Sequence, residues 1–443
     1  ALGLLSALIV SRFFWPSDAP PGGSDDAISA QWHGLVWVAG VLAVTMIGLV
    51  GNAVSGSLRF RFGLADAGLV ALVVLVGLSA SNALDRRPAI NLAWEWGGLL
   101  LTFLLARWLP RDRRETQALV AALIAAAAAV SVYGVYQVGV EFPQTRAMYR
   151  ANPERVLKLV GIAPGTPAQQ AFEDRLLGST EAIATFALAN SLAGFLLIPA
   201  VVLIGLIVGR VADRRARLPG PGWASWVLAL LPALAILLCL LLTKSRSAYI
   251  GLAVGGLVVL AAQARVIRAR PLLAFGGVGL GLILAITALL AAVGALDLKV
   301  LTESSKSLRY RVEYWTASWQ VLHEDSMTYW RGLGPGNFPG PYLRHKLETS
   351  SEEIKDPHNF VLDVWAIAGL PALMFWLASV TAAVVVMLRT PDSVARGDAN
   401  WRESVGRTRW LTVTAGLGGW ILATGVGDLD PFVGDGLNRW LIL

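Results

Sequence analysis

The turn between two apolar runs near residue 245 carries the first group that could do chemistry. Arg246 lies there in Thr243-Lys244-Ser245-Arg246-Ser247. A helix that begins at this point offers free backbone N–H groups, so Lys244, Ser245 and Arg246 are candidates for an anion site. The alternative is an arginine that reaches out to lipid head groups at the membrane edge.

A second cationic group consists of Arg309 and Arg311, shortly before Trp315. Apolar residues recur at helical spacing from Tyr310 to Leu322, which predicts an amphipathic helix on the membrane surface. The alternative is a solvated helix start in which Arg311 pairs with a nearby acid.

His358 is the third candidate, in Asp356-Pro357-His358-Asn359 immediately before an apolar run. Histidine accepts or donates a proton near neutral pH, so it can serve as a catalytic base or acid. The alternative is a helix-capping cluster in which Asp356 or Asn359 caps the following helix.

A glycine-rich run, Gly332-Leu333-Gly334-Pro335-Gly336-Asn337-Phe338, lies between these groups. Its glycine spacing is superficially that of a dinucleotide-binding loop. That fingerprint requires a preceding strand inside a βαβ unit, whereas a Trp-rich segment precedes this run. We therefore expect a flexible loop that permits close approach.

Composition places these groups in a membrane protein. Hydrophobic residues make up 55% of the 443 residues, charged residues 15%, and there are 17 Trp. A soluble domain has about 25% charged residues, and Trp is enriched at membrane interfaces. The net charge of +7 belongs to the loops of such a protein, and the long apolar runs argue against a nucleic-acid partner. Cys239, the single cysteine, excludes an intramolecular disulfide and a cysteine-based metal site.

The apolar runs predict an all-α polytopic membrane protein with about 11–12 transmembrane helices, since each run approaches the ~20 residues that a span needs. They are too long and too uniform for barrel strands. A twelfth run begins near Leu437, and both chain ends fall inside apolar stretches, which we interpret as trimmed boundaries. The eleven runs are 1–15, 34–52, 66–84, 90–109, 116–138, 182–209, 224–243, 247–264, 271–293, 360–388 and 409–427.

Charge in the loops predicts the orientation. Short basic loops belong in the cytoplasm, which puts the long loops 139–181 and 294–359 on the outer side; Arg86 and Arg87 are exceptions to the bias. The basic loops contain Arg59, Arg61, Arg111, Arg113, Arg114, Arg214, Arg215, Arg217, Arg265, Arg268, Arg270, Arg396, Arg402 and Arg407. We divide the chain into N-terminal helices (1–236), a catalytic region (237–388) and C-terminal helices (389–443).

In their order and spacing these motifs resemble the O-antigen ligase and polymerase superfamily of membrane glycosyltransferases. The resemblance covers about 237–388: Ser245-Arg246, Arg311 before Trp315, the glycine-rich run, Asp356-Pro357-His358-Asn359, and Gly369-Leu370-Pro371 in the next helix. Upstream, Ala189-Asn190-Ser191 resembles the family's Asn-containing helix start. The candidate catalytic residues are Arg246, Arg311 and His358; the candidate substrate-binding residues are Asn190, Lys244, Ser245, Arg309, Trp315, Gly334, Gly336, Asn337 and Asn359.

The resemblance implies a fold like that of GT-C-type membrane glycosyltransferases. It implies transfer of glycan from undecaprenyl diphosphate to lipid A–core, polysaccharide or protein at the periplasmic face of the bacterial inner membrane, without metal or other cofactor. Arginine's donor fork suits the diphosphate. Having both Arg309 and Arg311 leaves the second diphosphate ligand open, and spacing to Trp315 favours Arg311.

Two other functions remain open. A polymerase that extends the same glycans shares these motifs. A transporter or flippase of lipid-linked glycans would carry ionisable residues within its helices or inverted repeats with broken helices. Glu95, between Trp94 and Trp96, is one of few such charges, and the candidate residues gather on one face, which favours an enzyme.

Overall fold

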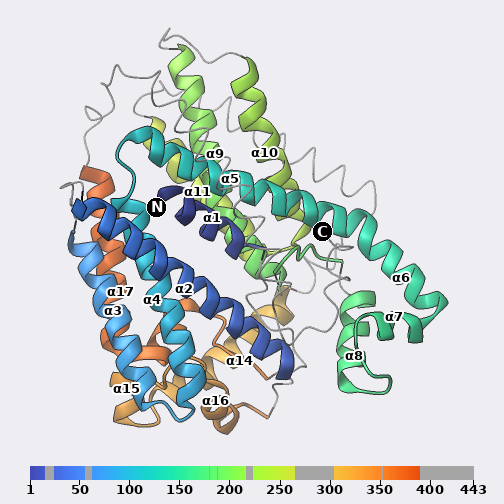
Figure 1. The fold of residues 1–443 in the computed structure, drawn as a ribbon. Coiled ribbons are helices and arrows are strands. Elements are labelled where there is room, and N and C mark those ends of the chain that lie inside the picture. The colour runs from blue at the N-terminus through green and yellow to red at the C-terminus, as the bar shows by residue number, and fades with distance from the viewer. Residues whose placement is uncertain are drawn as a thin grey trace. The chain divides into compact units, whose positions relative to one another are not determined.

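The computed structural model describes residues 1–14, 24–54, 62–178, 180–186, 188–215, 223–264, 304–348, 350 and 353–389 (Figure 1). The expected apolar runs at 271–293, at 409–427 and from Leu437 lie outside these residues, as do most of the basic loop residues.

All regular elements in the described ranges are helices. Their bounds are α1 Leu2–Arg12, α2 Ser24–Val54, α3 Leu64–Asn82, α4 Arg86–Trp108, α5 Arg113–Tyr136, α6 Phe142–Ala151, α7 Pro153–Leu159, α8 Pro167–Glu173, α9 Ala189–Arg215, α10 Trp223–Leu242, α11 Arg246–Ala264, α14 Ser304–Leu322, α15 Ser326–Arg331, α16 Pro339–His345 and α17 Phe360–Arg389. Two π-helical turns, η1 Gln137–Glu141 and η2 Asp174–Gly178, follow α5 and α8.

Six helical stretches in the described ranges are long and apolar enough to cross a membrane: Trp32–Val54, Leu64–Asn82, Arg86–Trp108, Arg113–Ala151, Ala189–Val208 and Phe360–Val386. Leu2–Arg12 and Ala229–Leu242 are shorter apolar helices. The chain is thus an all-α polytopic membrane protein, as its apolar runs predict.

Several helix boundaries differ from those of the apolar runs, and two of these differences have a visible structural cause. The helix expected over 116–138 continues through η1 and α6 to Ala151, because Gln137–Glu141 widens into a π-helical turn instead of ending the helix. The helix expected over 182–209 begins only at Ala189. Before it, the backbone N–H groups of Ile183 and Ala184 donate to the side chain of Gln137, which holds this segment out of the helix.

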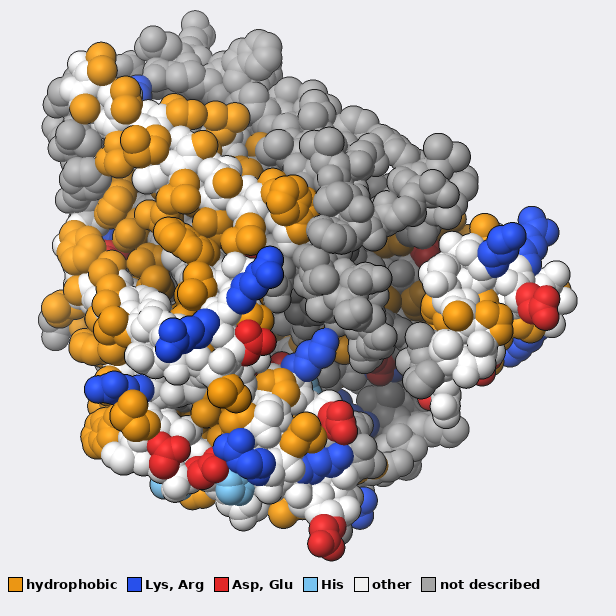
Figure 2. All heavy atoms as spheres, turned by 60° about the horizontal axis from the view of Figure 1, so that its bottom comes forward, with side chains coloured by type: hydrophobic (Ala, Val, Ile, Leu, Met, Phe, Trp, Pro, Cys, Tyr) orange, Lys and Arg blue, Asp and Glu red, His pale blue; other side chains and the backbone are white. Residues whose placement is uncertain are grey.

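The chain forms two compact units, each built from separate segments. Unit 1 contains residues 1–8, 31–119 and 299–418. Within it, α3, α4 and α17 lie side by side, and α14, α15 and α16 gather at the end of α3 and α4 where these two helices are joined (Figure 1). On the face in Figure 2, hydrophobic side chains cover a broad area, and charged side chains and His gather below it.

The core of unit 1 fixes α14 and α16 to the membrane helices. Leu72 and Val76 of α3, Tyr314 and Ala317 of α14, and Tyr342 of α16 are buried in one cluster with α17. Burying apolar surface stabilises such contacts by about 25 cal/mol per Å². The segment that carries α14 and α16 is therefore anchored to the membrane helices.

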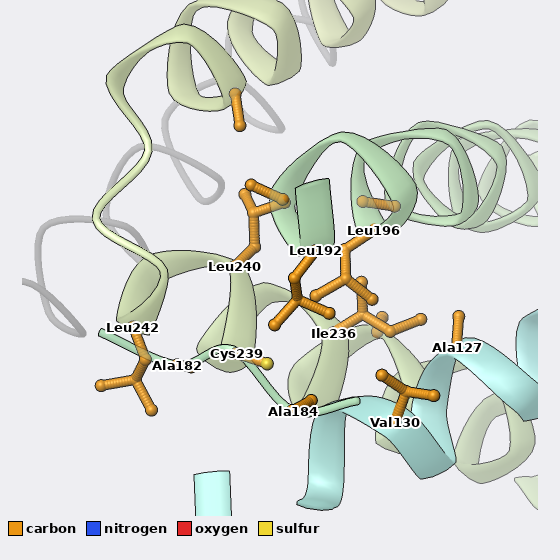
Figure 3. Close-up of a cluster of buried hydrophobic side chains, with 14 of the residues drawn as sticks. Ala127, Val130, Ala182, Ala184, Leu192, Leu196, Ile236, Cys239, Leu240 and Leu242 are labelled. Carbon is orange, nitrogen blue, oxygen red and sulfur yellow. The ribbon is translucent and has the colours of Figure 1, made fainter. Parts of the chain in front are cut away.

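Unit 2 contains residues 9–30, 120–298 and 419–443. Its core joins Val130 of α5, Leu192 and Leu196 of α9, and Ile236 and Leu240 of α10, as Figure 3 shows. The glycines of α11 at positions 251 and 255 let α9 approach: an added Cβ would lie within 2.8 Å and 2.7 Å of Leu197 and Val201. Close packing through small residues four apart is a common way to join membrane helices.

Candidate functional site

His358 is held by its neighbour Asp356. The Asp356 Oδ1 atom lies 3.0 Å from His358 Nδ1 and accepts a hydrogen bond of 2.8 Å from the His358 backbone N–H. The side-chain bond from His358 lowers the pKa of Asp356 below its ordinary value of 3.8, despite the opposing effect of burial. Asp356 therefore stays ionised near neutral pH as a hydrogen-bond acceptor for the imidazole.

The cap of α17 is Asn359, whose Oδ1 accepts from the backbone N–H of Val361 at 3.0 Å. Because Asn359 caps the helix, the Asp356 carboxylate remains available to bind His358. His358 itself has φ of 50°, an uncommon value for a residue other than glycine. Backbone strain of this kind costs about 1–3 kcal/mol and is found most often at functional positions. A substrate-binding role of Asn359 stays a prediction, since its amide already serves the helix.

Tyr314 links His358 to the helix that carries the arginine pair. The two rings meet edge to face with centroids 5.8 Å apart and planes at 69°. Tyr314 is buried in the core of unit 1, so it fixes the imidazole against α14. Arg311 precedes Tyr314 by three residues, a spacing that puts both on one side of a helix.

Arg309 and Arg311 differ in their partners. Arg309 Nε lies 3.5 Å from Glu313 Oε1, and its guanidinium lies 5.8 Å from the centre of the Tyr310 ring. Arg311 is half-buried, and no hydrogen bond or ion pair joins its side chain to another residue in the described part of the chain. The N–H donors of Arg311 thus remain available to a ligand. This supports the choice of Arg311 over Arg309 as the diphosphate ligand, which the spacing to Trp315 in the sequence favours.

Trp315 lies four residues after Arg311 and packs, partly buried, against the core of unit 1. Its indole Nε1 atom is buried and finds no hydrogen-bond partner among the described residues. Stacking of Trp315 on a sugar ring stays a prediction, and its visible contribution is to the core.

The glycine-rich run docks onto a break in α17. Pro371 has no N–H, so the carbonyl of Ile367, four residues earlier, lacks its helical partner. That carbonyl accepts instead from the backbone N–H of Gly334 at 3.0 Å and from the Ser79 hydroxyl at 2.7 Å. The Ala366 carbonyl likewise accepts from Leu333 N–H at 2.7 Å.

Two glycines make this docking possible. Gly369 has φ of 82°, and a Cβ there would collide with the backbone of Trp330 and Arg331. Gly332 has φ of 73°, and a Cβ there would meet Ala368 N at 2.5 Å. The glycine-rich run and the Gly369-Leu370-Pro371 break are therefore two halves of one backbone joint.

The other expected ligands in this run have structural partners. The Asn337 side chain accepts from Asp85 N–H at 2.7 Å and donates to the Asp85 carbonyl at 3.2 Å. Gly334 lies against Ala83, and Gly336 against Leu92. These contacts tie the run to the connection between α3 and α4, and direct substrate binding by Gly334, Gly336 and Asn337 stays a prediction.

The remaining candidates belong to unit 2. Arg246 is the first residue of α11, and Lys244, with φ of 54°, makes the turn before it. The Lys244 ammonium group donates to the Thr180 hydroxyl, and Ser245 is buried with its hydroxyl 3.3 Å from that of Ser247. Within the described ranges no hydrogen bond or ion pair joins the Arg246 side chain to another residue.

The segment 180–186, which precedes α9, lies against this turn. The Ala182 N–H donates to the Leu242 carbonyl at 3.0 Å, and burial raises the pKa of Glu181 while the charge of Lys244 opposes that rise. Asn190 is exposed in the first turn of α9, a few residues after this segment. Unit 2 thus gathers Lys244, Ser245 and Arg246 at one turn, and unit 1 gathers Arg309, Arg311, Trp315 and His358.

Sequence reasoning missed Tyr314, Thr180 and Glu181. Tyr314 stands in the helical pattern next to Trp315, so its aromatic type was visible, although its contact with His358 was not. Thr180 is 64 residues from Lys244 in the chain, and a separation of this size leaves no local signal.

Residues 231–377 match the model of the O-antigen ligase family. This confirms the resemblance, and the matched stretch contains Arg246, Arg311, the glycine-rich run and His358. No curated protein matches the chain significantly. The matched family implies a ligase- or glycosyltransferase-like enzyme, with glycans and lipid-linked molecules as its general classes of substrate.

Proposed function

We propose that the chain moves a glycan from undecaprenyl diphosphate to an acceptor at the periplasmic face of the bacterial inner membrane. The family match supports ligase-type transfer in general. One observation supports the finer proposal most: Asp356 holds His358 at 3.0 Å, beside a tyrosine on the helix that carries Arg311. A candidate base and a candidate phosphate ligand thus belong to one unit.

In the proposed step the acceptor hydroxyl oxygen attacks the anomeric carbon of the donor glycan. The bond from that carbon to the diphosphate oxygen breaks, and its electron pair leaves with undecaprenyl diphosphate. The hydroxyl proton passes to Nε2 of His358, while Nδ1–H donates to Asp356. Asp356 orients the imidazole and stabilises the imidazolium that forms, as the carboxylate does in a Ser-His-Asp triad.

Arg311 and Arg246 take the diphosphate in this proposal. Negative charge grows on the leaving group as the bond breaks, and the guanidinium fork offers paired N–H donors to phosphate oxygens. Two arginines would then do what a divalent cation does in other enzymes. Transfer should therefore survive excess EDTA; loss on chelation, with rescue by Mg²⁺ or Mn²⁺, would contradict the two-arginine proposal.

The acceptor distinguishes a ligase from a polymerase. Lipid A–core or a protein Ser/Thr is the acceptor of a ligase, and another lipid-linked repeat is that of a polymerase. In a deletion strain, accumulation of unattached undecaprenyl-linked polymer would support the ligase, and accumulation of single repeat units would support the polymerase.

A transporter or flippase is the alternative from another class. Glu95 lies within α4, where its carboxylate packs against Gly34 of α2. Purified protein reconstituted in vesicles, given a lipid-linked glycan and an acceptor, tests the two directly. Covalent attachment of the glycan supports the transferase; movement of the donor across a vesicle membrane with no product would support the transporter.

A further inference from the structure

A pocket of about 220 Å³ opens in unit 1 beside the glycine-rich run. It lies between the end of α3, at Ser79 and Asn82, and α15, at Asp325 and Arg331. The candidate catalytic residues Arg311 and His358 do not line it. It is thus a separate cavity in the unit that carries the proposed base.

The pocket contains one fixed anion. Asp325 caps α15, and its carboxylate accepts from the backbone N–H of Thr328 at 2.8 Å and from the Thr328 hydroxyl at 2.9 Å. These bonds lower the pKa of Asp325, the backbone bond most of all. The carboxylate is therefore ionised near neutral pH and keeps lone pairs for donors in the pocket.

The pocket also contains one cation. Arg331 lies in the last turn of α15, and within the described ranges no hydrogen bond or ion pair joins its guanidinium to another residue. A guanidinium presents five N–H donors. With Asp325 opposite in charge, the two groups offer both donors and acceptors at no net charge.

Apolar side chains complete the walls. Leu84, Met327, Leu333 and Pro341 also line the pocket, and the residues Leu84 and Met327 are 93% and 55% exposed. A pyranose ring combines C–H faces, which pack on apolar groups, with hydroxyls that both donate and accept. The cavity is smaller than the roughly 300–1,000 Å³ of drug-sized sites, as suits a ligand of one ring.

We propose that this pocket is a subsite for a single uncharged sugar ring of the glycan substrate, bound by Asp325 and Arg331 through its hydroxyls. The inference deepens the proposed function and rests on it for the identity of the glycan. A phosphate fits less well, because the Asp325 carboxylate would repel it. The subsite would select glycans by a ring distinct from the one that is transferred.

Direct binding tests the subsite without any transfer reaction. Saturation-transfer NMR is run on the full chain in nanodiscs with methyl glycosides of glucose, galactose, mannose, rhamnose and N-acetylglucosamine, and with inorganic phosphate in competition. We expect signals from at least one glycoside, a roughly tenfold weaker affinity in Arg331→Ala, and no displacement by phosphate. Signals from none of the glycosides, or displacement by phosphate, would overturn the proposal.

Two further variants make the test specific. Leu84→Arg places bulk and charge at a 93% exposed position, where folding is not at risk, and should abolish the glycoside signals that Arg331→Ala only weakens. Arg344→Gln removes an exposed arginine that pairs with Glu324 and does not line the pocket, so it should bind as the wild type does. Equal binding by the wild type, Arg331→Ala and Leu84→Arg would place the glycoside elsewhere and contradict the subsite.

The transfer assay separates this inference from the proposed function. If transfer occurs, Arg331→Ala should raise KM for the glycan about tenfold and leave kcat within about twofold, because each 1.4 kcal/mol of binding is a factor of ten. If no transfer occurs at all but glycosides bind through Arg331, the proposed function fails and the sugar site stands.

Discussion

Asp356 Oδ1 lies 3.0 Å from His358 Nδ1, and the same oxygen accepts the backbone N–H of His358 at 2.8 Å. The two bonds fix both the main chain and the ring of the histidine. The Tyr314 ring also meets the imidazole edge to face, with centroids 5.8 Å apart. A base for acceptor activation needs this kind of fixed orientation, because proton transfer depends on reach before it depends on pKa.

The first prediction concerns Asp356→Asn. Replacing the buried aspartate of a Ser-His-Asp triad by asparagine lowers kcat about 10⁴-fold. Because Asp356 is half-exposed, we expect Asp356→Asn to lower kcat by about 10²-fold. Loss of the anion also disfavours imidazolium, so the acidic limb of the rate profile should move to lower pH.

The titration of Asp356 itself does not interfere with this pH profile. Its pKa is lowered in the folded protein, so its contribution to stability is present above the ordinary value of 3.8 and is lost only as pH falls through the lowered pKa. Asp356 is therefore ionised throughout pH 5 to 8. The measurement is the transfer rate of the wild type and of Asp356→Asn over this pH range. An acidic limb that moves to higher pH in Asp356→Asn would contradict the pairing of Asp356 with His358.

The second prediction separates the two arginines. Arg311→Ala should lower transfer about 10²–10³-fold, the usual cost of removing one transition-state donor, and Arg311→Lys should restore little because a point charge lacks the fork. Arg309→Ala is the matched control, since Arg309 already pairs with Glu313. Initial rates with purified variants decide; a greater loss in Arg309→Ala than in Arg311→Ala would reverse the assignment.

The third prediction concerns the backbone joint at the break in α17. Gly369→Ala places a Cβ against the Trp330 carbonyl at φ of 82°. Strain of about 1–3 kcal/mol is the expected result, visible as a lower apparent melting temperature. Gly340→Ala is the control, because nothing lies within 4 Å of the added Cβ. Equal melting temperatures of the two variants would show that the joint tolerates a side chain.

The fourth prediction concerns topology. Lys158→Cys and Glu348→Cys, at exposed positions in the two long loops, should react with an impermeant thiol reagent added to spheroplasts. Arg111→Cys, exposed in a short basic loop, should react only after lysis. The native Cys239 is buried, so background labelling should be low. The reverse pattern would put the proposed site in the cytoplasm and refute the mechanism.

Local pattern was sufficient for the helices and for the order of the motifs. The apolar run 360–388 became α17, and the amphipathic run 310–322 became most of α14. The Gly369-Leu370-Pro371 break was visible as residue types, because proline removes a helical donor wherever it occurs.

Contacts between residues far apart in the chain could not be predicted from the local sequence pattern. The Ser79 hydroxyl bonds the Ile367 carbonyl across 288 residues, and Asp85 pairs with Asn337 across 252. Such bonds gave structural partners to Asn337 and to the glycine-rich run, which the sequence suggested only as ligands. The late start of α9 has the same cause, since Gln137 holds Ile183 and Ala184 across 46 and 47 residues.

The most direct test of the central claim is transfer by His358→Ala in nanodiscs, with donor binding measured on the same sample. We expect unchanged binding of the undecaprenyl-linked donor and a loss of transfer of about 10²–10⁴-fold, as for removal of a general base. His323→Ala and His345→Ala, outside the Asp356–Asn359 motif, should keep most activity. Near-normal turnover by His358→Ala, with donor binding intact, would contradict its role as the base.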